Sequence, residues 1–528
     1  MAFLDWTWSC SDWVLLLLFT GVALYFWGTS NYNHFSKQNV PFVKPLPFVG
    51  SMGPSLLRKQ YFPQLVMSTY NKLKDHPYGG FFMFKQPVLV LRDLELIKAI
   101  AVKDFEYFTD HRSVLPTDAE PVWSRILFAL KGQRWRDMRA TLSPAFTSSK
   151  MKTMFVLLSE CCQNFVHFLE QCYQQTQQNE CKIEKEGDLL IVEMKDFYTR
   201  YTNDVIATAA FGIGVDSLKQ PTNEFYMMGQ DLTYLGGFRA IKWLAYMAVP
   251  KLIQKLRISL MPAHITKFFR SLVLDTIATR EREGIVRPDM LQLLMQAKEG
   301  TLHEDNSAVN KKMKLEDDDI IAQAVLFFLA GFDTSSTLLC FASYQLAVHP
   351  DVQSRLQEEI DETLQEHGGR FTYEAVHSMK YLDMVVSETL RLHPPAPSVD
   401  RLCVQPYILK ANPPMEIHPG EMLFIPIYAL HHDPSYYPDP ERFDPERFSD
   451  DNKHNINPMT YLPFGVGPRS CIGNRFALME TKLALVYLLS QFTLKVVSRT
   501  PVPIRIVQKG FNMSIDGGFW FGLEKRKS

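Results

Sequence analysis

The chain has 528 residues, of which 46% are apolar and 21% are charged, and its formal net charge is -1. These proportions exclude disordered, collagenous and coiled-coil chains and indicate a folded protein with a large core. The balanced charge gives no reason to expect a nucleic acid partner, because phosphate binding needs clustered basic residues. The eight cysteines include no C-x-x-C pair and are too few for a disulfide scaffold. Reduced thiols in a cytosol-facing protein are therefore expected.

The amino-terminal segment from Trp13 to Asn33 has no charged side chain and no histidine. As a helix at about 1.5 Å per residue it spans roughly 31 Å, enough to cross the apolar core of a bilayer. Aspartates precede it and basic residues follow it, which predicts a lumenal amino terminus and a cytosolic body. A cleaved signal peptide is the alternative, but its basic start and small-residue cleavage site are missing. We expect residues 1–33 to form a lumenal tip and a retained transmembrane anchor.

Residues 34–54 contain prolines at positions 41, 45, 47 and 54, which fix φ and remove amide donors. The segment is predicted to be a stiff hinge between anchor and body, with an ordinary surface loop as the alternative. Length alone suggests about three domains in the whole chain. No Gly/Ser-rich linker interrupts residues 55–528, however, so a single large domain is expected there.

Mostly helical patterns, interrupted by short strand patterns, follow the hinge, and no fixed-period repeat indicates a solenoid or propeller. The predicted fold class is mainly α, an α+β arrangement with small β-sheets. Polar residues 303–314 predict a surface loop. Helices are expected over residues 151–165, 193–210, 264–281, 288–298, 315–347 and 352–366, and strands over residues 87–91, 422–426 and 492–497.

Residues 225–249 are unusually rich in aromatic residues and methionine. Plain core packing is the commoner explanation of such a stretch. Because the predicted anchor already holds the body near a membrane, a second apolar membrane contact or an apolar substrate channel is the alternative.

The predicted helix over residues 315–347 begins with acidic residues, which suit the positive end of a helix dipole. Its apolar run then contains Asp333 followed by four hydroxyl side chains, which cost free energy in such surroundings unless they have a task. Gly331 weakens the helix and Thr334 can bond the carbonyl of Ala330, so a kink or a water-filled groove is expected. Hydroxyls that merely bond their own helix are the alternative explanation.

Cys471 lies between a loop of glycines and prolines, residues 463–470, and the start of an apparent helix. A thiolate there can receive backbone N–H bonds and the positive end of the dipole, so a lowered pKa and metal binding are expected. A zinc site needs three or four protein ligands, which a single cysteine cannot supply. A haem iron needs only one, because the porphyrin supplies the equatorial nitrogens. The other seven cysteines are expected to be packing residues.

The run from Phe464 to Gly473 matches F-x-x-G-x-R-x-C-x-G, with Gly467, Arg469 and Cys471 at its fixed positions. This long and specific motif resembles the haem-thiolate signature of the cytochrome P450 family, and the resemblance extends over nearly the whole chain. It implies a triangular, mostly α domain that binds haem b, iron protoporphyrin IX, with Cys471 as the axial ligand of the metal. Phe464 is then expected to pack over the thiolate.

Glu388 and Arg391 lie at i and i+3 of a predicted helix, where they face one another. Alone they would be a commonplace surface pair, but they resemble the buried E-x-x-R pair of the family, which an arginine from a P-E-R-F segment joins. Two such segments occur, and Arg447 is preferred to Arg442 because its distance from Cys471 resembles that in the family.

Haem carries two propionates, which favour cationic partners. Trp135 and Arg139 lie at i and i+4 and resemble the W-x-x-x-R propionate contact of the family. Arg469, Arg401 and Arg112 are further candidates by the same resemblance. A solvated surface charge is the alternative for any single arginine.

The run from Ala330 to Thr337 resembles the A-G-x-D/E-T-T/S oxygen-binding groove of the family, with Ser335 in place of the second threonine. The resemblance implies that O2 binds opposite Cys471 and that Asp333 and Thr334 relay protons to it. One oxygen atom then enters a C–H or C=C bond of the substrate.

The resemblance is to microsomal members, which implies the cytosolic face of the endoplasmic reticulum membrane. It also implies electrons from the diflavin NADPH-cytochrome reductase, with cytochrome b5 as a second candidate partner. Basic residues could steer such an acidic partner or be ordinary solvated charges: Lys131, Arg134, Arg136, Arg475 and Lys482. The regions expected to line the substrate pocket are mainly apolar and predict a hydrophobic small molecule: 127–128, 327–328, 396–399 and 511–513.

The whole-chain pattern resembles most the insect xenobiotic-metabolising branch allied to vertebrate drug-oxidising members, which implies oxidation of insecticides or plant toxins. Biosynthetic oxidation of a hormone, steroid or fatty acid is one alternative. A reductase-independent haem-thiolate isomerase or dehydratase is another, although Asp333 and Thr334 argue against it. A carrier of apolar ligands without catalysis is the third.

Overall fold

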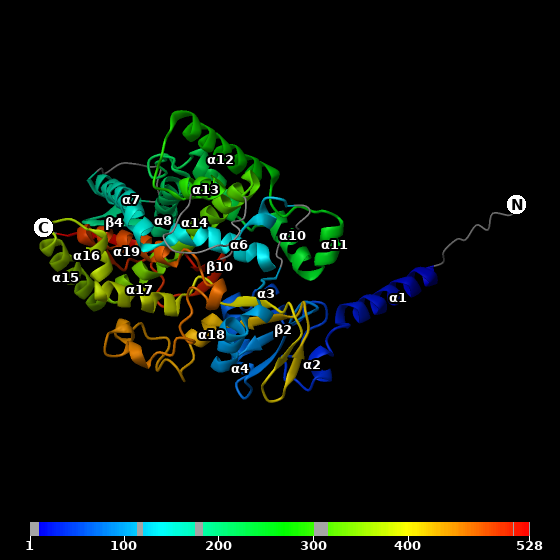
Figure 1. Ribbon diagram of the computed structural model, residues 1–528. Helices are drawn as coiled ribbons and strands as arrows, with labels where there is room; N and C mark the ends of the chain where they lie inside the picture. Colours follow the sequence, from blue (N-terminus) through cyan, green and yellow to red (C-terminus); the bar gives the residue numbers. More distant parts are fainter. Residues whose placement is uncertain (1–9, 113–119, 175–182, 300–314, 510–511, 527–528) are drawn as a thin grey trace.

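The computed structural model describes residues 10–112, 120–174, 183–299, 315–509 and 512–526. Helices make up most of the body, which confirms the mainly α expectation (Figure 1). The helices are α1 (Cys10–Thr29), α2 (His34–Lys37), α3 (Gly53–Leu56), α4 (Phe62–Lys72), α5 (Leu94–Lys98), α6 (Gly132–Leu142), α7 (Ser148–Gln174), α8 (Met194–Ile206), α9 (Glu224–Thr233), α10 (Gly237–Ala248), α11 (Pro250–Lys255), α12 (Ala263–Glu283), α13 (Met290–Glu299), α14 (Asp317–Val348), α15 (Pro350–Glu366), α16 (Tyr373–Ser378), α17 (Lys380–Leu392), α18 (Ile427–His431) and α19 (Asn474–Gln491).

The strands are short and form small sheets. They are β1 (Tyr78–Met83), β2 (Gln86–Leu91), β3 (Ile183–Glu186), β4 (Leu189–Glu193), β5 (Val399–Leu402), β6 (Tyr407–Leu409), β7 (Met415–Ile417), β8 (Met422–Ile425), β9 (Phe492–Lys495), β10 (Ile506–Lys509), β11 (Asn512–Ile515) and β12 (Trp520–Lys525). Two four-stranded sheets have the orders β1-β2-β8-β5 and β3-β4-β12-β9, and two hairpins pair β6 with β7 and β10 with β11. In the first sheet β2 runs parallel to β8, with Leu89 beside Leu423. The three predicted strands are confirmed as β2, β8 and β9.

Helix α14 forms the centre of the body and packs against α8 and α19. A capping box between Glu316 and Asp319 starts it, and most of its apolar side chains are buried. Among the described helices α14 is long and apolar enough to cross a membrane, but 67% of its most apolar window is buried. It is therefore a core helix. The loop predicted over residues 303–314 lies outside the described residues.

Helix α1 stands off the body, and its side chains from Trp13 to Phe26 are exposed (Figure 1). Its described apolar stretch, Trp13–Thr29, is at the short end of the lengths that cross a bilayer. Only the end of the described helix contacts the body, where Lys85 lies 3.9 Å over the ring of Trp27. The exposed apolar side chains before that point are compatible with the expected anchor.

Residues 34–54 are folded onto the first sheet and do not form a separate hinge. Phe35 is buried, and its ring packs edge-on against Phe82 of β1 at a centroid distance of 5.2 Å. The Tyr32 hydroxyl donates to the Leu46 carbonyl at 2.9 Å, which ties the end of the anchor to this segment. The predicted boundary between hinge and body is therefore corrected, because Phe35, before the first proline, and Phe42, after it, both pack against Phe82 of β1.

The six predicted helices are confirmed as parts of α7, α8, α12, α13, α14 and α15. Residues 225–249 divide into two parts. Phe225 and Tyr226 on α9 are buried in the core, whereas Phe238 and Ile241 on α10 are exposed. Core packing is thus correct for the first part, and the second part is an apolar surface.

Candidate active site

The loop before Cys471 is held in one shape by its glycines and by a backbone hydrogen bond. Gly465 and Gly467 have φ angles of 75° and 74°. A Cβ on Gly467 would also collide with the carbonyl oxygen of Ala101, so only glycine fits there. The Cys471 amide donates to the Phe464 carbonyl at 2.8 Å. The loop therefore delivers Cys471 to a fixed place just before α19.

Cys471 differs from the other cysteines in its surroundings. Of the cysteines at positions 161, 162, 172, 340, 403 and 471, Cys471 alone is exposed. Protein atoms still surround its sulfur closely enough that burial raises the pKa of the thiol, while a hydrogen bond from the Gly473 amide and the charge of Arg139 oppose this rise. The expected lowering of this pKa is therefore wrong, because desolvation outweighs the effects of the helix start.

Helix α14 presents an accessible strip near this loop. Ala330 is exposed within an otherwise buried stretch, and Thr334, one turn later, is half-buried. The Thr334 hydroxyl donates to the Ala330 carbonyl at 2.5 Å, as predicted. Phe146 links the two elements: its ring packs edge-on against Phe327 of α14, and it lies 3.6 Å from the position that a Cβ on Gly473 would take. The strip and Cys471 therefore belong to neighbouring elements.

The Asp333 carboxylate makes an ion pair with Lys195 of α8 at 2.6 Å. The same ammonium group donates to the hydroxyls of Ser336 and Thr337 at 2.8 and 2.9 Å. The polar run in α14 thus has a charged partner, which sequence reasoning missed because Lys195 comes from a helix far away in the chain. The helix itself is continuous through this run.

Three of the predicted arginines gather beside the cysteine loop. Arg469 lies 4.0 Å over the ring of Trp135. Arg139 and Arg401 donate to backbone carbonyls of residues 463–470 at 2.8 and 2.9 Å. Burial lowers the pKa of Arg469 to about 9 and that of Arg401 to about 10, and the buried Nε of Arg401 has no hydrogen-bond partner among the described residues. Such an interior favours an anionic group.

The structure does not bring Arg112 into this cluster. Its guanidinium lies against the Met247 carbonyl at 3.3 Å, away from the cysteine loop. The preceding residue, His111, faces the cluster instead: its ring is bonded to Asp400 at 3.0 Å, and burial and the nearby arginine charges lower its pKa despite that carboxylate. Neighbouring side chains in an extended segment point to opposite sides, so a shift of one residue changes which one faces the site.

Glu388 and Arg391 are fully buried and form a bidentate pair at 2.7 and 2.8 Å. Arg447 joins them with its Nε 3.4 Å from the Glu388 carboxylate, which also accepts a hydrogen bond from the Asp444 amide at 3.0 Å. Arg442 contributes only its backbone carbonyl, to Arg391 at 3.3 Å. The choice of Arg447 is confirmed, and a commonplace surface pair is excluded.

Comparison with known proteins agrees with this arrangement. The family model Cytochrome P450 matches residues 40–519. The chain belongs to the cytochrome P450 family. Cytochrome P450 9e2 of Blattella germanica is 59% identical over 97% of this chain and 98% of that protein. Probable cytochrome P450 9f2 of Drosophila melanogaster is 39% identical over 97% and 99% of the two chains, and cytochrome P450 6j1 of Blattella germanica is 39% identical over 96% of each. The chain is thus a cytochrome P450 monooxygenase with insect relatives.

Cytochromes P450 bind haem b through a cysteine thiolate, and the residues of this chain fit that group. Cys471 is exposed and lies just before α19, which packs against α14. The unpartnered Nε of Arg401 suits a propionate. The Arg469 guanidinium adds positive charge beside it, although it already donates to three backbone carbonyls and pairs with Asp110. The hydrogen bond between their backbones keeps Phe464 beside Cys471.

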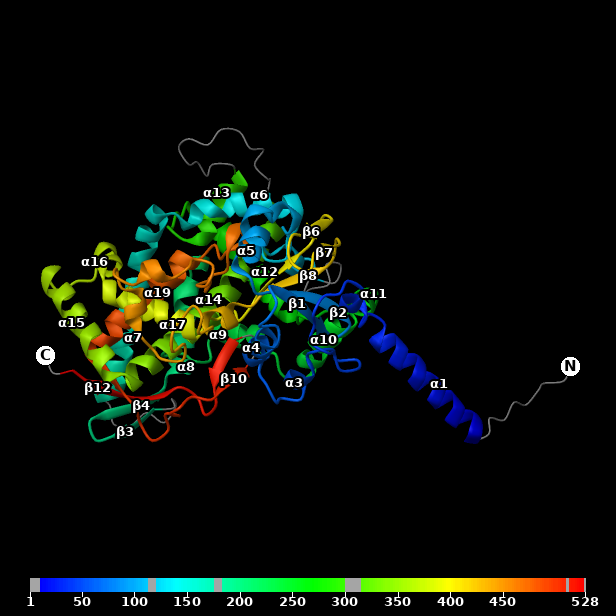
Figure 2. The same ribbon diagram turned by 90° about the horizontal axis from the view of Figure 1, so that it is seen from below.

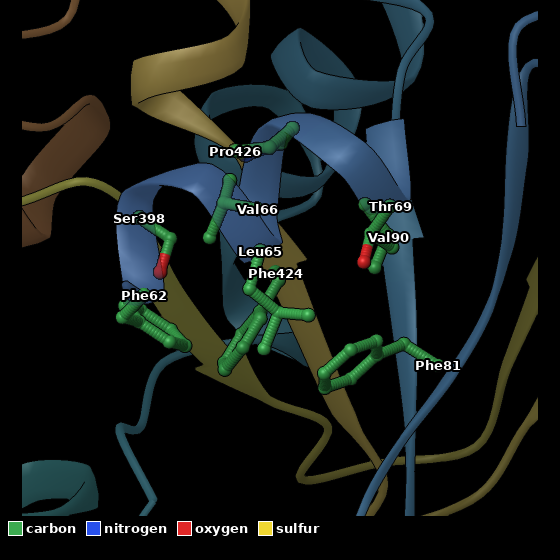
Figure 3. Close-up of a pocket in the computed structure, with 9 residues that line it drawn as sticks. All are labelled: Phe62, Leu65, Val66, Thr69, Phe81, Val90, Ser398, Phe424 and Pro426. Carbon is green, nitrogen blue, oxygen red and sulfur yellow. The ribbon is translucent and has the colours of Figure 1, made fainter. Parts of the chain in front are cut away.

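Several residues expected to line the substrate pocket lie elsewhere. Phe328 is fully buried against aromatic rings of α9 and α12, and Phe511 lies outside the described residues. Phe128 is exposed and stacks on His111, beside the arginines. Ser398 faces a different pocket, between α4 and the first sheet, with room for about one water molecule (Figure 3). That pocket is too small for an organic substrate.

Glu480 on α19 is fully buried, and burial raises its pKa to about 8. Its pKa is thus higher in the folded chain than in the unfolded chain. Between these two pKa values the folded chain binds more protons, so the free energy of unfolding falls as pH rises through this range. Through Glu480, the free energy of unfolding is expected to fall by about 2 kcal/mol between pH 6 and pH 8, and Glu480→Gln is expected to abolish this fall. Chemical unfolding at the two pH values measures this, and an unchanged pH slope contradicts it.

Proposed function

We propose that this cytochrome P450 inserts one atom of O2 into hydrophobic small molecules with electrons from NADPH, and that it acts on xenobiotics such as insecticides or plant toxins. The observation that carries the proposal is the rigid loop that holds Cys471 just before α19, with Arg139 and Arg401 bonded to its backbone. The insect relatives support the xenobiotic branch.

We assign Cys471 as the axial ligand, and Arg139, Arg401 and Arg469, with Trp135, as the propionate contacts. When bound, the thiolate-ligated haem supplies the activation of O2. The rigid loop fixes the sulfur, and the buried arginines orient the cofactor by its acidic edge.

The side chains of α14 perform the proton chemistry in this proposal. Asp333 holds a carboxylate that reaches the α8 side of the helix, and the Thr334 hydroxyl sits on the accessible strip, bonded to the Ala330 carbonyl. A carboxylate followed by a hydroxyl can hold and pass protons between solvent and the strip. Apolar neighbours on α14 exclude bulk water from the rest of the space.

We propose the diflavin NADPH-cytochrome reductase as the electron donor, with cytochrome b5 as a second donor. Of the basic candidates for docking it, Lys482 is excluded because it is buried and paired with an aspartate. Arg134 and Arg136 are paired with acidic residues of this chain. Lys131 and Arg475 are exposed and stay in the proposal.

We propose that α1 anchors the chain in the endoplasmic reticulum membrane with a lumenal amino terminus, and that α10 and α11 rest on the cytosolic leaflet. Phe238, Ile241 and Leu244 on α10 and Leu252 on α11 are all exposed. Both views place these helices at the same end of the body as α1 (Figure 1, Figure 2). An exposed apolar patch beside an anchor suits a lipid surface.

A chain that lacks residues 1–29 is expected to keep part of its binding to phospholipid vesicles. The Phe238→Asp, Ile241→Asp double variant of this shortened chain is expected to lose that binding, because two charges replace apolar contacts with lipid. Co-sedimentation with vesicles measures the bound fraction. Val286→Asp is the matched control, since Val286 is 76% exposed but lies between α12 and α13. Equal binding by the double variant and the control contradicts the proposed contact.

Turnover tests the proposed function. The full-length chain, reconstituted with the reductase, is expected to convert apolar insecticides or plant toxins to oxygenated products only when NADPH is present. Turnover of peroxides without NADPH would instead show an isomerase or dehydratase. Turnover confined to a hormone, steroid or fatty acid would show a biosynthetic enzyme, and no turnover over a broad panel would show a carrier.

A further inference from the structure

A charged contact between α8 and α14 falls on Asp333. Lys195, in the first turn of α8, donates to the Asp333 carboxylate at 2.6 Å and to the Asp333 backbone carbonyl at 3.4 Å. It also donates to the hydroxyls of Ser336 and Thr337 at 2.8 and 2.9 Å. An ammonium group has three protons to donate, and these acceptors engage all of them. The Lys195 side chain is therefore held in one place.

The surroundings of the pair make it more than a surface ion pair. The Lys195 and Asp333 side chains are 27% and 21% exposed, while Ser336 and Thr337 are buried. The pair is thus shielded from most solvent yet still reaches it. The Asp333 carboxylate is turned toward α8, whereas the hydroxyl of Thr334, the next residue, is turned back to its own helix.

We infer that Lys195 is a positioning residue for Asp333 and Thr334: it holds the Asp333 carboxylate at the solvent-reaching side of α14, so that protons enter the site beside α8. This inference rests on the proposed function, in which Asp333 serves the proton relay. Lys195 bonds side chains of α14 and acts through Asp333. When Asp333 is not held in place, protons are no longer delivered together with the electrons. NADPH, O2 and a proton then yield NADP⁺ and H2O2 in place of product and water.

A purely structural role is the competing explanation, because Lys195 also serves buried hydroxyls. Tyr198→Phe is the matched control, since the Tyr198 hydroxyl bonds Ser343 at 2.6 Å across the same α8–α14 interface. A structural role predicts that Lys195→Met and Tyr198→Phe both lower the melting temperature and leave the products of turnover unchanged.

The experiment uses the full-length chain with reductase and a turned-over substrate. Lys195→Met is expected to keep its haem, to lower product formed per NADPH about tenfold with a matching rise in H2O2, and to change the solvent deuterium isotope effect on product formation. Lys195→Arg keeps the cation and restores most of the coupling. Tyr198→Phe leaves product per NADPH unchanged.

A second readout needs no turnover. The falls in melting temperature caused by Lys195→Met and Asp333→Asn are expected to be non-additive, with the double variant melting well above the additive value. Unchanged coupling in Lys195→Met, with Asp333→Asn uncoupled, overturns this inference alone. Unchanged coupling in Asp333→Asn overturns the proposed relay, and the inference falls with it.

Discussion

Replacing Glu388 by alanine is expected to leave the chain without bound haem. Both Glu388 and Arg391 are fully buried, so the change strands an uncompensated guanidinium in the core beside the cysteine-bearing part of the fold. Breaking a buried pair in this way costs about 3–5 kcal/mol, a large share of the roughly 5–15 kcal/mol that stabilises a typical protein. In the same step Arg447 loses its ion-pair partner and the Asp444 amide loses its hydrogen-bond acceptor.

Haem content per chain, from pigment absorbance after purification, measures this effect. Glu446→Ala is the matched control, because Glu446 lies next to Arg447 but pairs with Arg355 at the exposed surface. Surface pairs of this kind contribute about 0–1 kcal/mol, so the control is expected to keep its haem. A full haem complement in Glu388→Ala would show that the buried network is not needed for the fold.

Thr334→Ala is expected to bind haem normally and to release most of its reducing equivalents as H2O2. The change removes one hydroxyl, whose bond to the Ala330 carbonyl is local to the helix, and alanine favours a helix. Stability is therefore little affected. A group that delivers protons contributes about 10²–10⁴-fold to a rate, so product per NADPH is expected to fall by roughly 10².

Product, H2O2 and NADPH consumption, measured together, give this ratio. Thr363→Ala is the matched control, since the Thr363 hydroxyl also bonds the carbonyl four residues earlier in its helix, at 2.7 Å, but on α15. The control is expected to match the unchanged chain. Equal coupling in the two variants would remove Thr334 from the proton relay.

The local elements of this fold could be predicted because short-range pattern decides them. The strands β2, β8 and β9 and the long helix α14 follow from runs of apolar residues and from a helix-starting acidic cluster. Arg447 could be chosen over Arg442 because its distance from Cys471 along the chain resembles that in the family, and the buried pair confirms the choice.

The remaining features depend on packing between distant segments. Lys195 reaches Asp333 from another helix, so its charge has no local signature beside the polar run of α14. The pKa of Cys471 was expected to be lowered from the helix start alone, whereas the surrounding protein raises it. His111 and Arg112 are adjacent, and only the observed direction of the chain shows which one faces the arginine cluster.

Cys471 is expected to ligate the haem iron through its sulfur, and the carbon monoxide difference spectrum of the reduced, full-length chain tests this most directly. We expect the red-shifted Soret band of thiolate-ligated haem, and its loss in Cys471→Ala. A band typical of imidazole-ligated haem, or the same red-shifted band in Cys471→Ala, would contradict it.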